Sequence, residues 1–367
     1  MKLLTVLGAR PQFIKAATIS RLIKKKNDIE EIIVHTGQHF DNHMSDIFFD
    51  QLDIPHPRYN LNISNLSHGA MTGRMLEEIE TLIKKEKPDW VMVYGDTNST
   101  LAGALAASKL HIPLAHIEAG LRSNNPVMPE EINRILTDRV SSLLLCPTQT
   151  AVNNLNKEGF PFSAINSSGH TELQRIVKTG DVMFDAVLYY RDRAKAEISL
   201  DRFNLQHHNY VLCTLHRQEN TDDIKRLKNI LSAFREIAKS LPLILPLHPR
   251  TNNKIEQQLN ADALQGLTIL KPLSYLEMQR LQMSAKLIIT DSGGIQKESY
   301  FHKVPCITLR DETEWVETVE SGWNKLTGAN TEKILNAWHN ASTYSNQAEN
   351  LFGDGKAAKK ILNEFFL

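Results

Sequence analysis

The stretch that decides the fold is LIITDSGGIQKESYF, residues 287–301. Its first four residues, 287–290, are apolar or β-branched and are typical of the end of a buried strand. Asp291, Ser292 and two consecutive glycines follow, and the polar run after them is typical of a helix. Paired glycines at such a junction indicate that the backbone closely approaches some other group, because glycine has no side chain to obstruct it.

The same order of elements recurs along the chain: a short apolar run, a turn with glycine or a polar residue, and an amphipathic stretch. It appears in KLLTVLGARPQFIKAA from residue 2, DWVMVYGDTNSTLAG from 89, IPLAHIEAG from 112, YVLCTLHRQEN from 210 and PLILPLHPRTNN from 242. Strands that alternate with helices and contain few polar residues indicate parallel sheets buried on both faces. The sequence therefore predicts a doubly wound α/β fold.

Polar side chains stand where these predicted strands end. Such sheets bind ligands outside the carboxyl ends of their strands. One or two of these residues would be ordinary loop residues, but six at equivalent positions predict a ligand cleft: Arg10, Asp96, Glu118, His216, His248 and Ser292.

The alternation breaks between residues 180 and 208, where the chain is charged and helical. With 367 residues the chain is long enough for two domains. We predict a first α/β domain at 1–180, a crossover at 181–208 and a second α/β domain at 209–355. The amphipathic segment 356–367 is expected to pack back on the first domain, and the ligand cleft is expected between the two domains.

The amino-acid composition and charge limit the kinds of binding partner that are expected. Hydrophobic residues make up 41% and charged residues 23%, the formal net charge is zero and the pI is about 7.3. Nothing in this balance favours a nucleic-acid or membrane partner. No signal peptide or membrane-length apolar run is present, so a cytoplasmic location is expected. Cys146, Cys213 and Cys306 lie in apolar runs without a CxxC pair and are predicted to be buried thiols.

The segment TDSGGIQKES has features of a phosphate site. A helix N-terminus offers free N–H groups and a partial positive charge, and glycines leave room for an anion. Ser292 would add a hydroxyl donor, and Glu298 could accept hydrogen bonds from a ribose. The alternative is a tight strand–helix turn that simply needs glycine. Neither GxxxxGK[ST] nor GxGxxG is present, so a dinucleotide cofactor is not expected.

The other candidate residues are cations, carboxylates and histidines. Arg10 and Lys15 flank a helix start at Pro11 and could pair with a diphosphate or a sugar carboxylate, although either alone would pass for a surface residue. Asp96 and Glu118 suit general acid/base chemistry. His216 is a plausible donor to a diphosphate, whereas His248 is as easily a satisfied histidine. Two further acids in the first turn of a helix, Glu130 and Glu131, are explained as partners of the helix dipole.

Taken together, the motifs resemble the non-hydrolysing UDP-N-acetylglucosamine 2-epimerases. They are GARPQFIKAA, TGQHF, YGDTNSTLAGALAA, HIEAGLRS, PEEINR, TLHRQEN, PLHPRT and TDSGGIQKES, in order over nearly the whole chain. The resemblance implies a GT-B fold of two Rossmann-like domains, usually dimeric, with a UDP-sugar in the interdomain cleft. It also implies a reaction without metal or NAD, in which UDP is eliminated across C1–C2 and added back with C2 inverted.

The resemblance also implies roles for residues. The family's catalytic acids match Asp96, Glu118 and Glu130, one of which removes the C2 proton. Lys15, Arg10, Arg134 and His216 match residues that hold the diphosphate, and Lys15 and His216 are also grouped with the catalytic residues. His248 is assigned to substrate binding. Ser292, Gly293 and Gly294 match the phosphate cradle, and Glu298 matches the ribose contact. On this basis the paired glycines admit a UDP diphosphate.

Several motifs depart from the family pattern. The chain has GARPQ where members acting on UDP-N-acetylglucosamine have GTRPE, and TEWVE, with Trp315, where they have TERPE. TGDVMFDA replaces a TGN segment, and Gln38-His39 is followed by FDNHM, which puts allosteric activation in doubt. These variants resemble the branch acting on UDP-2,3-diacetamido-2,3-dideoxy-glucuronate for surface polysaccharide such as O-antigen. Gln12 is hypothesised to remove a negative charge beside the carboxylate of that substrate.

Three alternatives remain open. A retaining GT-B glycosyltransferase would share the phosphate cradle but would not need three acids in the first half of the chain. A hydrolysing epimerase would release UDP and free sugar. A non-catalytic UDP-sugar-binding regulator would have no reason to keep Asp96, Glu118 and Glu130.

Overall fold

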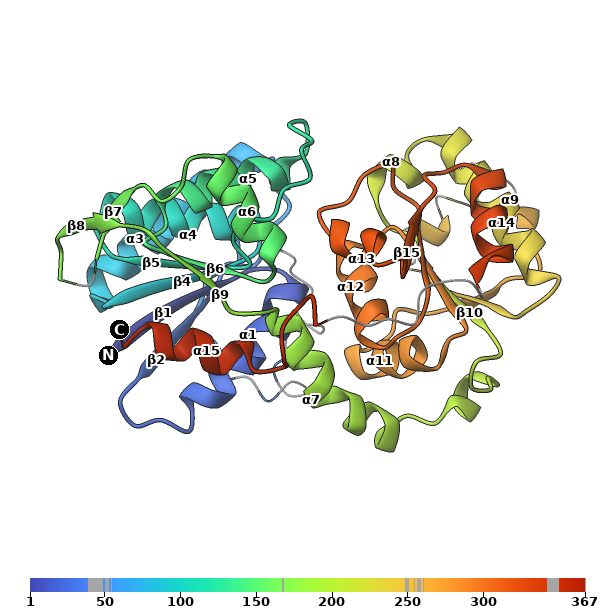
Figure 1. Cartoon of the computed structure of the whole chain (residues 1–367), viewed down its shortest axis with the longest axis horizontal. Coiled ribbons are helices and arrows are strands. Elements are labelled where there is room, and N and C mark those ends of the chain that lie inside the picture. The colour runs from blue at the N-terminus through green and yellow to red at the C-terminus, as the bar shows by residue number, and fades with distance from the viewer. Residues whose placement is uncertain are drawn as a thin grey trace. The chain divides into compact units, whose positions relative to one another are not determined.

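The computed structural model describes residues 1–38, 49, 53, 55–166, 168–247, 251–253, 255, 259, 261–341 and 350–366. The chain forms two compact units. Unit 1 comprises Met1–Ala186 and Asn350–Leu367, and unit 2 comprises Val187–Glu349. Each is built around its own parallel sheet with helices on both faces (Figure 1). The predicted fold of two doubly wound α/β units is confirmed.

The sheet of unit 1 has seven strands in the order β3-β2-β1-β4-β5-β6-β9, and every neighbouring pair is parallel. The order reverses direction between β1 and β4, which is the position where ligands bind in doubly wound sheets. The strands are β1 (Lys2–Leu7), β2 (Glu30–His35), β3 (Tyr59–Asn60), β4 (Trp90–Tyr94), β5 (Leu114–Ile117), β6 (Leu143–Cys146) and β9 (Arg175–Lys178).

Helices cover both faces of this sheet. Figure 1 shows α3, α4, α5 and α6 on one side and α1 and α15 on the other. They are α1 (Arg10–Ile23), α3 (His68–Glu86), α4 (Asn98–Lys109), α5 (Pro129–Val140), α6 (Gln149–Lys157) and α15 (Ala357–Glu364), while α7 (Val182–Glu197) runs from unit 1 into unit 2. Helix α1 begins next to Pro11, which predicted its start, and α5 begins at Pro129.

The sheet of unit 2 has six parallel strands in the order β12-β11-β10-β13-β14-β15. The strands are β10 (Val211–Thr214), β11 (Leu243–Pro246), β12 (Thr268–Leu270), β13 (Leu287–Thr290), β14 (Cys306–Thr308) and β15 (Asn324–Leu326). The helices include α8 (Gln218–Thr221), α9 (Ile224–Ala238), α11 (Tyr275–Ser284), α12 (Gly293–Phe301), α13 (Val316–Glu320) and α14 (Thr331–His339), with 3-10 turns η1 (Leu200–Phe203) and η2 (Ala261–Leu264).

The strands β10, β11 and β13 of unit 2 are mostly apolar because both faces of the sheet are covered there. Val211 and Leu287 point into the core that contains Phe234 of α9. Their chain neighbours Leu212 and Ile288 point into the opposite core. Alternate residues of one strand therefore reach different hydrophobic cores, as expected for a buried parallel sheet.

Some elements confirm the sequence predictions and others were missed. The three cysteines lie buried in β6, β10 and β14, as predicted. A small antiparallel hairpin, β7 (Ser163–Ile165) with β8 (Thr171–Leu173), was not predicted, because its strands are short and largely exposed. No helix within the described part of the chain is long and apolar enough to cross a membrane.

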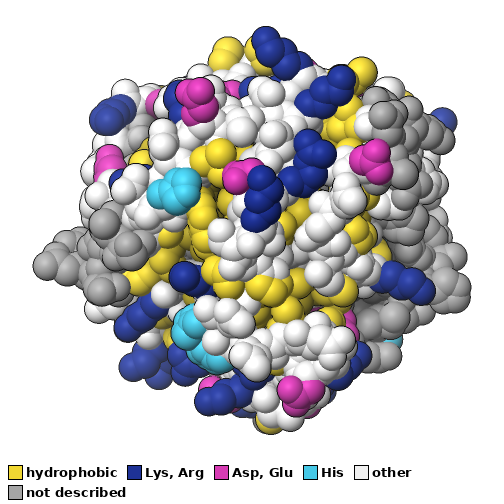
Figure 2. All heavy atoms as spheres, turned by 90° about the vertical axis from the view of Figure 1, so that its right-hand side faces the viewer, with side chains coloured by type: hydrophobic (Ala, Val, Ile, Leu, Met, Phe, Trp, Pro, Cys, Tyr) yellow, Lys and Arg dark blue, Asp and Glu magenta, His cyan; other side chains and the backbone are white. Residues whose placement is uncertain are grey.

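Among the described side chains on the face shown in Figure 2, charges of both signs occur. Figure 2 shows the side that lies at the right of Figure 1. Lys and Arg side chains stand at several separate places on this face, with Asp and Glu side chains among them and hydrophobic ones between.

Candidate functional site

Two turns at the carboxyl edge of the unit 1 sheet present acidic side chains. After β4 the chain turns through Gly95, with φ 62°, to Asp96, and after β5 it turns at Glu118, with φ 75°. A positive φ at a residue other than glycine costs about 1–3 kcal/mol and persists only where the surroundings enforce it. The strained backbone at Glu118 therefore marks a carboxylate whose placement is held by other contacts.

Glu118 pairs with a lysine from the first helix. Lys15 Nζ of α1 forms an ion pair with Glu118 Oε2, and both side chains are buried. Gly95 lies against this pair: a Cβ on Gly95 would stand 3.3 Å from Lys15 Nζ and 4.0 Å from Glu118 Oε2. The fold thus brings a cation of α1, the β4 turn and the β5 turn to one place.

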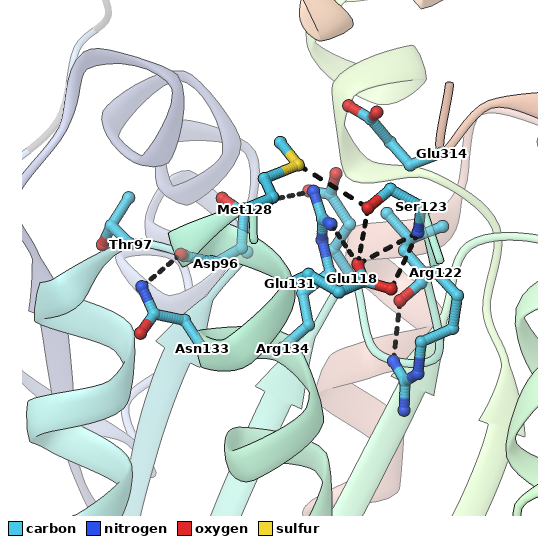
Figure 3. Close-up of polar contacts among 12 residues, drawn as sticks. Asp96, Thr97, Glu118, Arg122, Ser123, Met128, Glu131, Asn133, Arg134 and Glu314 are labelled. Carbon is cyan, nitrogen blue, oxygen red and sulfur yellow. Dashed lines mark hydrogen bonds and ion pairs between the residues drawn. The ribbon is translucent and has the colours of Figure 1, made fainter. Parts of the chain in front are cut away.

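Asp96 belongs to a second ion-pair chain, drawn in Figure 3. Arg134 of α5 donates from one terminal nitrogen to Asp96 Oδ2 at 2.6 Å and from the other to Glu131 Oε2 at 2.7 Å. Asn133 Nδ2 donates to the backbone oxygen of Asp96 at 2.9 Å. Helix α5 therefore fixes both the side chain and the backbone of Asp96.

Glu131 does more than complement the dipole of α5. Its carboxylate accepts hydrogen bonds from the backbone N–H groups of Ser123 at 3.0 Å and Asn124 at 2.9 Å. Burial would raise the pKa of Glu131, but these N–H groups and Arg134 outweigh it, so the pKa is lowered. The explanation of Glu131 as a dipole partner is therefore incomplete, because the residue anchors the loop before α5. Glu130, its neighbour, is half-buried at the start of the same helix.

The carboxyl edge of the unit 2 sheet holds an Asp–His pair. Asp291, fully buried after β13, accepts the backbone N–H groups of His216 at 3.0 Å and Arg217 at 2.9 Å. His216 Nδ1 lies 2.9 Å from Asp291 Oδ1, while much of the imidazole stays exposed. Desolvation would lower the pKa of His216, but the carboxylate of Asp291 outweighs it and raises the pKa. Asp291 thus orients a histidine that favours its charged form.

The two glycines after β13 are there for different reasons. Helix α12 begins at Gly293 with Ser292 as its N-cap. A Cβ on Gly293 would lie only 2.4 Å from Glu314 Oε1, and Glu314 is itself held by Arg310 at 2.9 Å. A Cβ on Gly294 would meet nothing nearer than Ser292 Oγ at 3.9 Å. Gly293 therefore makes room for the protein's own carboxylate, and only Gly294 borders open space.

The remaining predicted residues take up different positions. Glu298, on α12, is buried and accepts a hydrogen bond from Gln282 Nε2 at 2.6 Å. Arg10 is half-buried as the first residue of α1. His248 lies outside the described residues.

The structure gives Gln12 an internal role that the sequence did not predict. Its Oε1 accepts from the backbone N–H groups of Gly8 at 2.8 Å and Ala9 at 2.9 Å, and its Nε2 donates to the backbone oxygen of Tyr94 at 2.7 Å. Gln12 Nε2 also bonds to the hydroxyl groups of Thr97 and Thr100. The side chain is fully buried and its hydrogen-bonding capacity is used inside unit 1. Gln12 joins the turns after β1 and β4 and has no group left to face a ligand.

Sequence reasoning missed the residues that hold others in place. Asn133 and Asp291 were not assigned, although both stand within quoted motifs. For Asp291 the available signal was its place directly after a strand, whereas Asn133 lies within α5 and carried no such signal. In the described residues, no group of three or more His, Cys, Asp or Glu side chains is arranged to hold a metal ion.

Two α/β units, each with a parallel sheet, one with strand-end carboxylates and the other with a glycine turn at a helix N-terminus, define a GT-B-like enzyme. Comparison with known proteins identifies the family. The family model for UDP-N-acetylglucosamine 2-epimerase matches residues 21–365, and the chain belongs to this family. The resemblance read from the motifs is confirmed.

Individual relatives support the same family assignment. The chain is 52% identical, over 98% of both proteins, to UDP-2,3-diacetamido-2,3-dideoxy-D-glucuronate 2-epimerase of Pseudomonas aeruginosa. It is 50% identical to a UDP-N-acetylglucosamine 2-epimerase homolog of Methanococcus maripaludis, over 99% of this chain and 98% of the relative. The crystal structure of Methanocaldococcus jannaschii UDP-GlcNAc 2-epimerase in complex with UDP-GlcNAc and UDP superposes with a TM-score of 0.90, at 45% identity, over 100% of this chain and 99% of that one. The protein is an isomerase, a UDP-sugar 2-epimerase.

Proposed function

We propose that the enzyme inverts C2 of UDP-2,3-diacetamido-2,3-dideoxy-glucuronate to give the mannuronate epimer. The observation that carries this proposal is the 52% identity over 98% of both chains to the Pseudomonas aeruginosa enzyme with that name. Interconversion of UDP-N-acetylglucosamine and UDP-N-acetylmannosamine is the second candidate. It is favoured by the 45% identity to the Methanocaldococcus jannaschii UDP-GlcNAc 2-epimerase.

The proposed reaction is an elimination followed by an addition. A carboxylate takes the proton from C2, the electrons of the C–H bond form a C1–C2 double bond, and the C1–O bond breaks to release UDP. UDP then adds back to C1, while a proton reaches the opposite face of C2. No oxidation state changes between substrate and product, so the balance requires no redox cofactor.

Unit 1 supplies candidates for the proton transfers. Asp96, Glu118 and Glu130 are the proposed catalytic acids, and a proton on carbon calls for a carboxylate held at hydrogen-bonding range. Arg134 and Lys15 support this proposal, because they hold Asp96 and Glu118 through ion pairs. Fixed partners reduce the reorganisation that each proton transfer would otherwise require.

The leaving group needs positive charge and hydrogen-bond donors. We assign the diphosphate to Arg10, Lys15, Arg134, His216 and His248, with Ser292, Gly293 and Gly294 at the start of α12, and the ribose to Glu298. The raised pKa of His216 supports its role, since a charged imidazole stabilises an anion. The open space beside Gly294 supports phosphate binding at this turn.

The cellular setting is part of the proposal. We propose that the enzyme is a cytoplasmic homodimer that supplies an activated sugar for surface polysaccharide such as O-antigen. Light scattering after size-exclusion chromatography measures the mass directly. Twice the chain mass of 41.6 kDa is expected, and a single chain mass would refute the dimer.

Proton NMR in D2O tests the reaction. One tube contains enzyme and UDP-N-acetylglucosamine, and the other contains UDP-2,3-diacetamido-glucuronate. Deuterium at C2 with a new manno-configured signal is expected first in the second tube. Net release of UDP with free sugar would instead identify a hydrolysing epimerase. If neither exchange nor release occurs, the substrate proposal is wrong and a glycosyltransferase becomes the better explanation.

Variants link the exchange to the proposed acids. Glu118→Gln removes the carboxylate but keeps the side-chain shape, and C2 exchange should fall by about 10²- to 10⁴-fold. Glu172→Gln, an exposed glutamate of β8 in the same unit, is the matched control and should exchange at the wild-type rate.

A further inference from the structure

A buried histidine stands between the two turns that carry acids in unit 1. His116 lies in β5, two residues before Glu118, and is completely buried. Its Nδ1 is 2.7 Å from Asp138 Oδ1 of α5, and its Nε2 is 2.7 Å from the backbone oxygen of Gly95. Both ring nitrogens therefore make short hydrogen bonds, each to an oxygen of a different segment.

The partners of His116 decide the direction of these bonds. The carbonyl oxygen of Gly95 can only accept. Asp138 Oδ2 already accepts from the backbone N–H of Gly120 at 3.1 Å and from an Arg122 nitrogen at 2.8 Å, as an ionised carboxylate would. Burial would raise the pKa of Asp138, but His116 and Arg122 outweigh it and lower the pKa. With Asp138 ionised, both neighbours of the ring are acceptors, and the geometry favours a ring that donates from both nitrogens.

The surrounding charges balance the positive charge of a ring that carries protons on both nitrogens. Arg122 also binds Glu158, from Nε to Oε1 at 2.6 Å and from a terminal nitrogen to Oε2 at 2.8 Å. Two carboxylates, Asp138 and Glu158, thus face one guanidinium and one imidazole. A buried ionic group is tolerated when its charge is compensated and its hydrogen bonds are made.

These bonds tie together three segments that carry the proposed acids. Gly95 immediately precedes Asp96, and Gly120 is two residues after Glu118. Asp138 lies one turn beyond Arg134 on α5, the helix that holds Asp96. A shift of the ring would therefore move the Asp96 turn, the Glu118 turn and α5 relative to one another.

We propose that His116, donating from both ring nitrogens to Gly95 and Asp138, is a positioning residue that sets the relative placement of the Asp96 and Glu118 carboxylates. Its effect on catalysis rests on the proposed function, whereas the state of its ring does not. A misplacement of about 1 Å in a catalytic group can lower a rate by about 100-fold. This is the effect expected when the ring is lost.

The first test measures the protonation of the His116 ring in the wild-type protein. Nitrogen-15 NMR of histidine-labelled enzyme, with His116→Gln to assign the signal, reports whether each ring nitrogen carries a proton. Protons on both nitrogens are expected in the folded enzyme. A signal with one unprotonated ring nitrogen would overturn the proposal, because one of the two bonds would then run the other way. This measurement needs neither substrate nor activity.

The second test separates positioning from binding. In His116→Gln, the rate of C2 deuterium exchange at saturating substrate should fall by about 10- to 100-fold. KM and the affinity for UDP should stay within about twofold, since the proposed phosphate and ribose groups of unit 2 are untouched. Asp138→Asn should show the same pattern. His302→Gln is the control: this half-buried histidine of unit 2 bonds to Gln279 Oε1 at 2.8 Å, and its loss should leave the exchange rate unchanged.

The outcomes are distinguishable. An unchanged kcat in folded His116→Gln, or a raised KM with an unchanged kcat, would overturn the positioning role. If the variant does not fold, Asp138→Asn and the nitrogen-15 spectrum of the wild-type enzyme still decide. If wild-type enzyme exchanges no proton of any UDP-sugar offered, the proposed function fails, and the spectrum alone still decides whether the ring donates from both sides.

Discussion

Gly293 and Gly294 stand side by side after β13, but different atoms lie where their side chains would begin. The missing side chain of Gly293 leaves room for Glu314, which is pinned by Arg310. The missing side chain of Gly294 leaves a free approach to the start of α12. One repeated residue type therefore serves internal packing at the first position and access to the helix N-terminus at the second.

Alanine at each position separates these uses. Gly293→Ala should lower the stability of unit 2 by about 1–3 kcal/mol, because the new methyl group displaces Glu314 from Arg310. Gly294→Ala should leave the melting temperature nearly unchanged and weaken UDP binding by about tenfold, equivalent to about 1.4 kcal/mol. Thermal melting and titration calorimetry with UDP measure both effects. Equal losses of stability in the two variants would show that this distinction is wrong.

At the level of elements, local signals account for where the long helices begin. Pro11 and Pro129 lie in the first turns of α1 and α5, whereas Ser292 occupies the N-cap position of α12 without a side-chain cap hydrogen bond. Helix α11 adds a capping box: Ser274 Oγ accepts from Glu277 N at 3.3 Å, and Ser274 N donates to Glu277 Oε2 at 2.8 Å. The short strands β3, β7 and β8 lack comparable signals, because exposed two- and three-residue strands carry no hydrophobic period.

The capping box predicts a difference between two serines. Ser274→Ala should destabilise α11 by about 1 kcal/mol, because the N–H of Glu277 loses its acceptor. Ser67, the N-cap of α3, makes no side-chain cap hydrogen bond and provides the matched control. Ser67→Ala should therefore change the free energy of unfolding by less than about 0.5 kcal/mol. Urea unfolding of both variants checks the difference, and an equal cost would refute it.

At the level of the whole molecule, the last segment of the chain completes the first unit. Phe365 packs edge-on against Trp90 of β4, with ring centroids 5.2 Å apart. Arg175 of β9 pairs with Glu364, and the side chain of Asp185 accepts the N–H groups of Ala357 and Ala358 at the start of α15. Unit 1 is therefore built from both ends of the sequence.

Replacing each of two aromatic residues near the C-terminus by alanine tests whether the C-terminal segment stabilises unit 1. Phe365→Ala should destabilise unit 1 by about 3 kcal/mol, since a buried ring is replaced by a cavity. Phe366, 48% exposed, is the adjacent control, and its replacement by alanine should cost less than about 1 kcal/mol. Hydrogen exchange followed by mass spectrometry should show faster exchange in β4 and α15 and unchanged rates in β10–β13. Uniform acceleration through both units would contradict the assignment.

The class of fold, the long helices and strands, and the polar residues at strand ends could be predicted from the sequence. These features follow from hydrophobic period and turn residues, which act over a few neighbouring positions. The motifs were also specific enough to indicate the family, which comparison with known proteins confirmed. The order of the helices and strands and the kinds of residue at the strand ends could therefore be predicted from the sequence.

The sequence did not show which polar groups meet, because their contacts depend on the folded arrangement of distant segments. Gln12 bonds to the backbone of Tyr94, and His116 bonds to Asp138 of a later helix, across separations of 82 and 22 residues. The same holds for Glu314 beside Gly293. A sequence shows that a residue can donate or accept, but its partner depends on how distant segments fold together. The physical reason is that a buried polar group must find some partner, and the packing of the sheets and helices determines which one lies within reach.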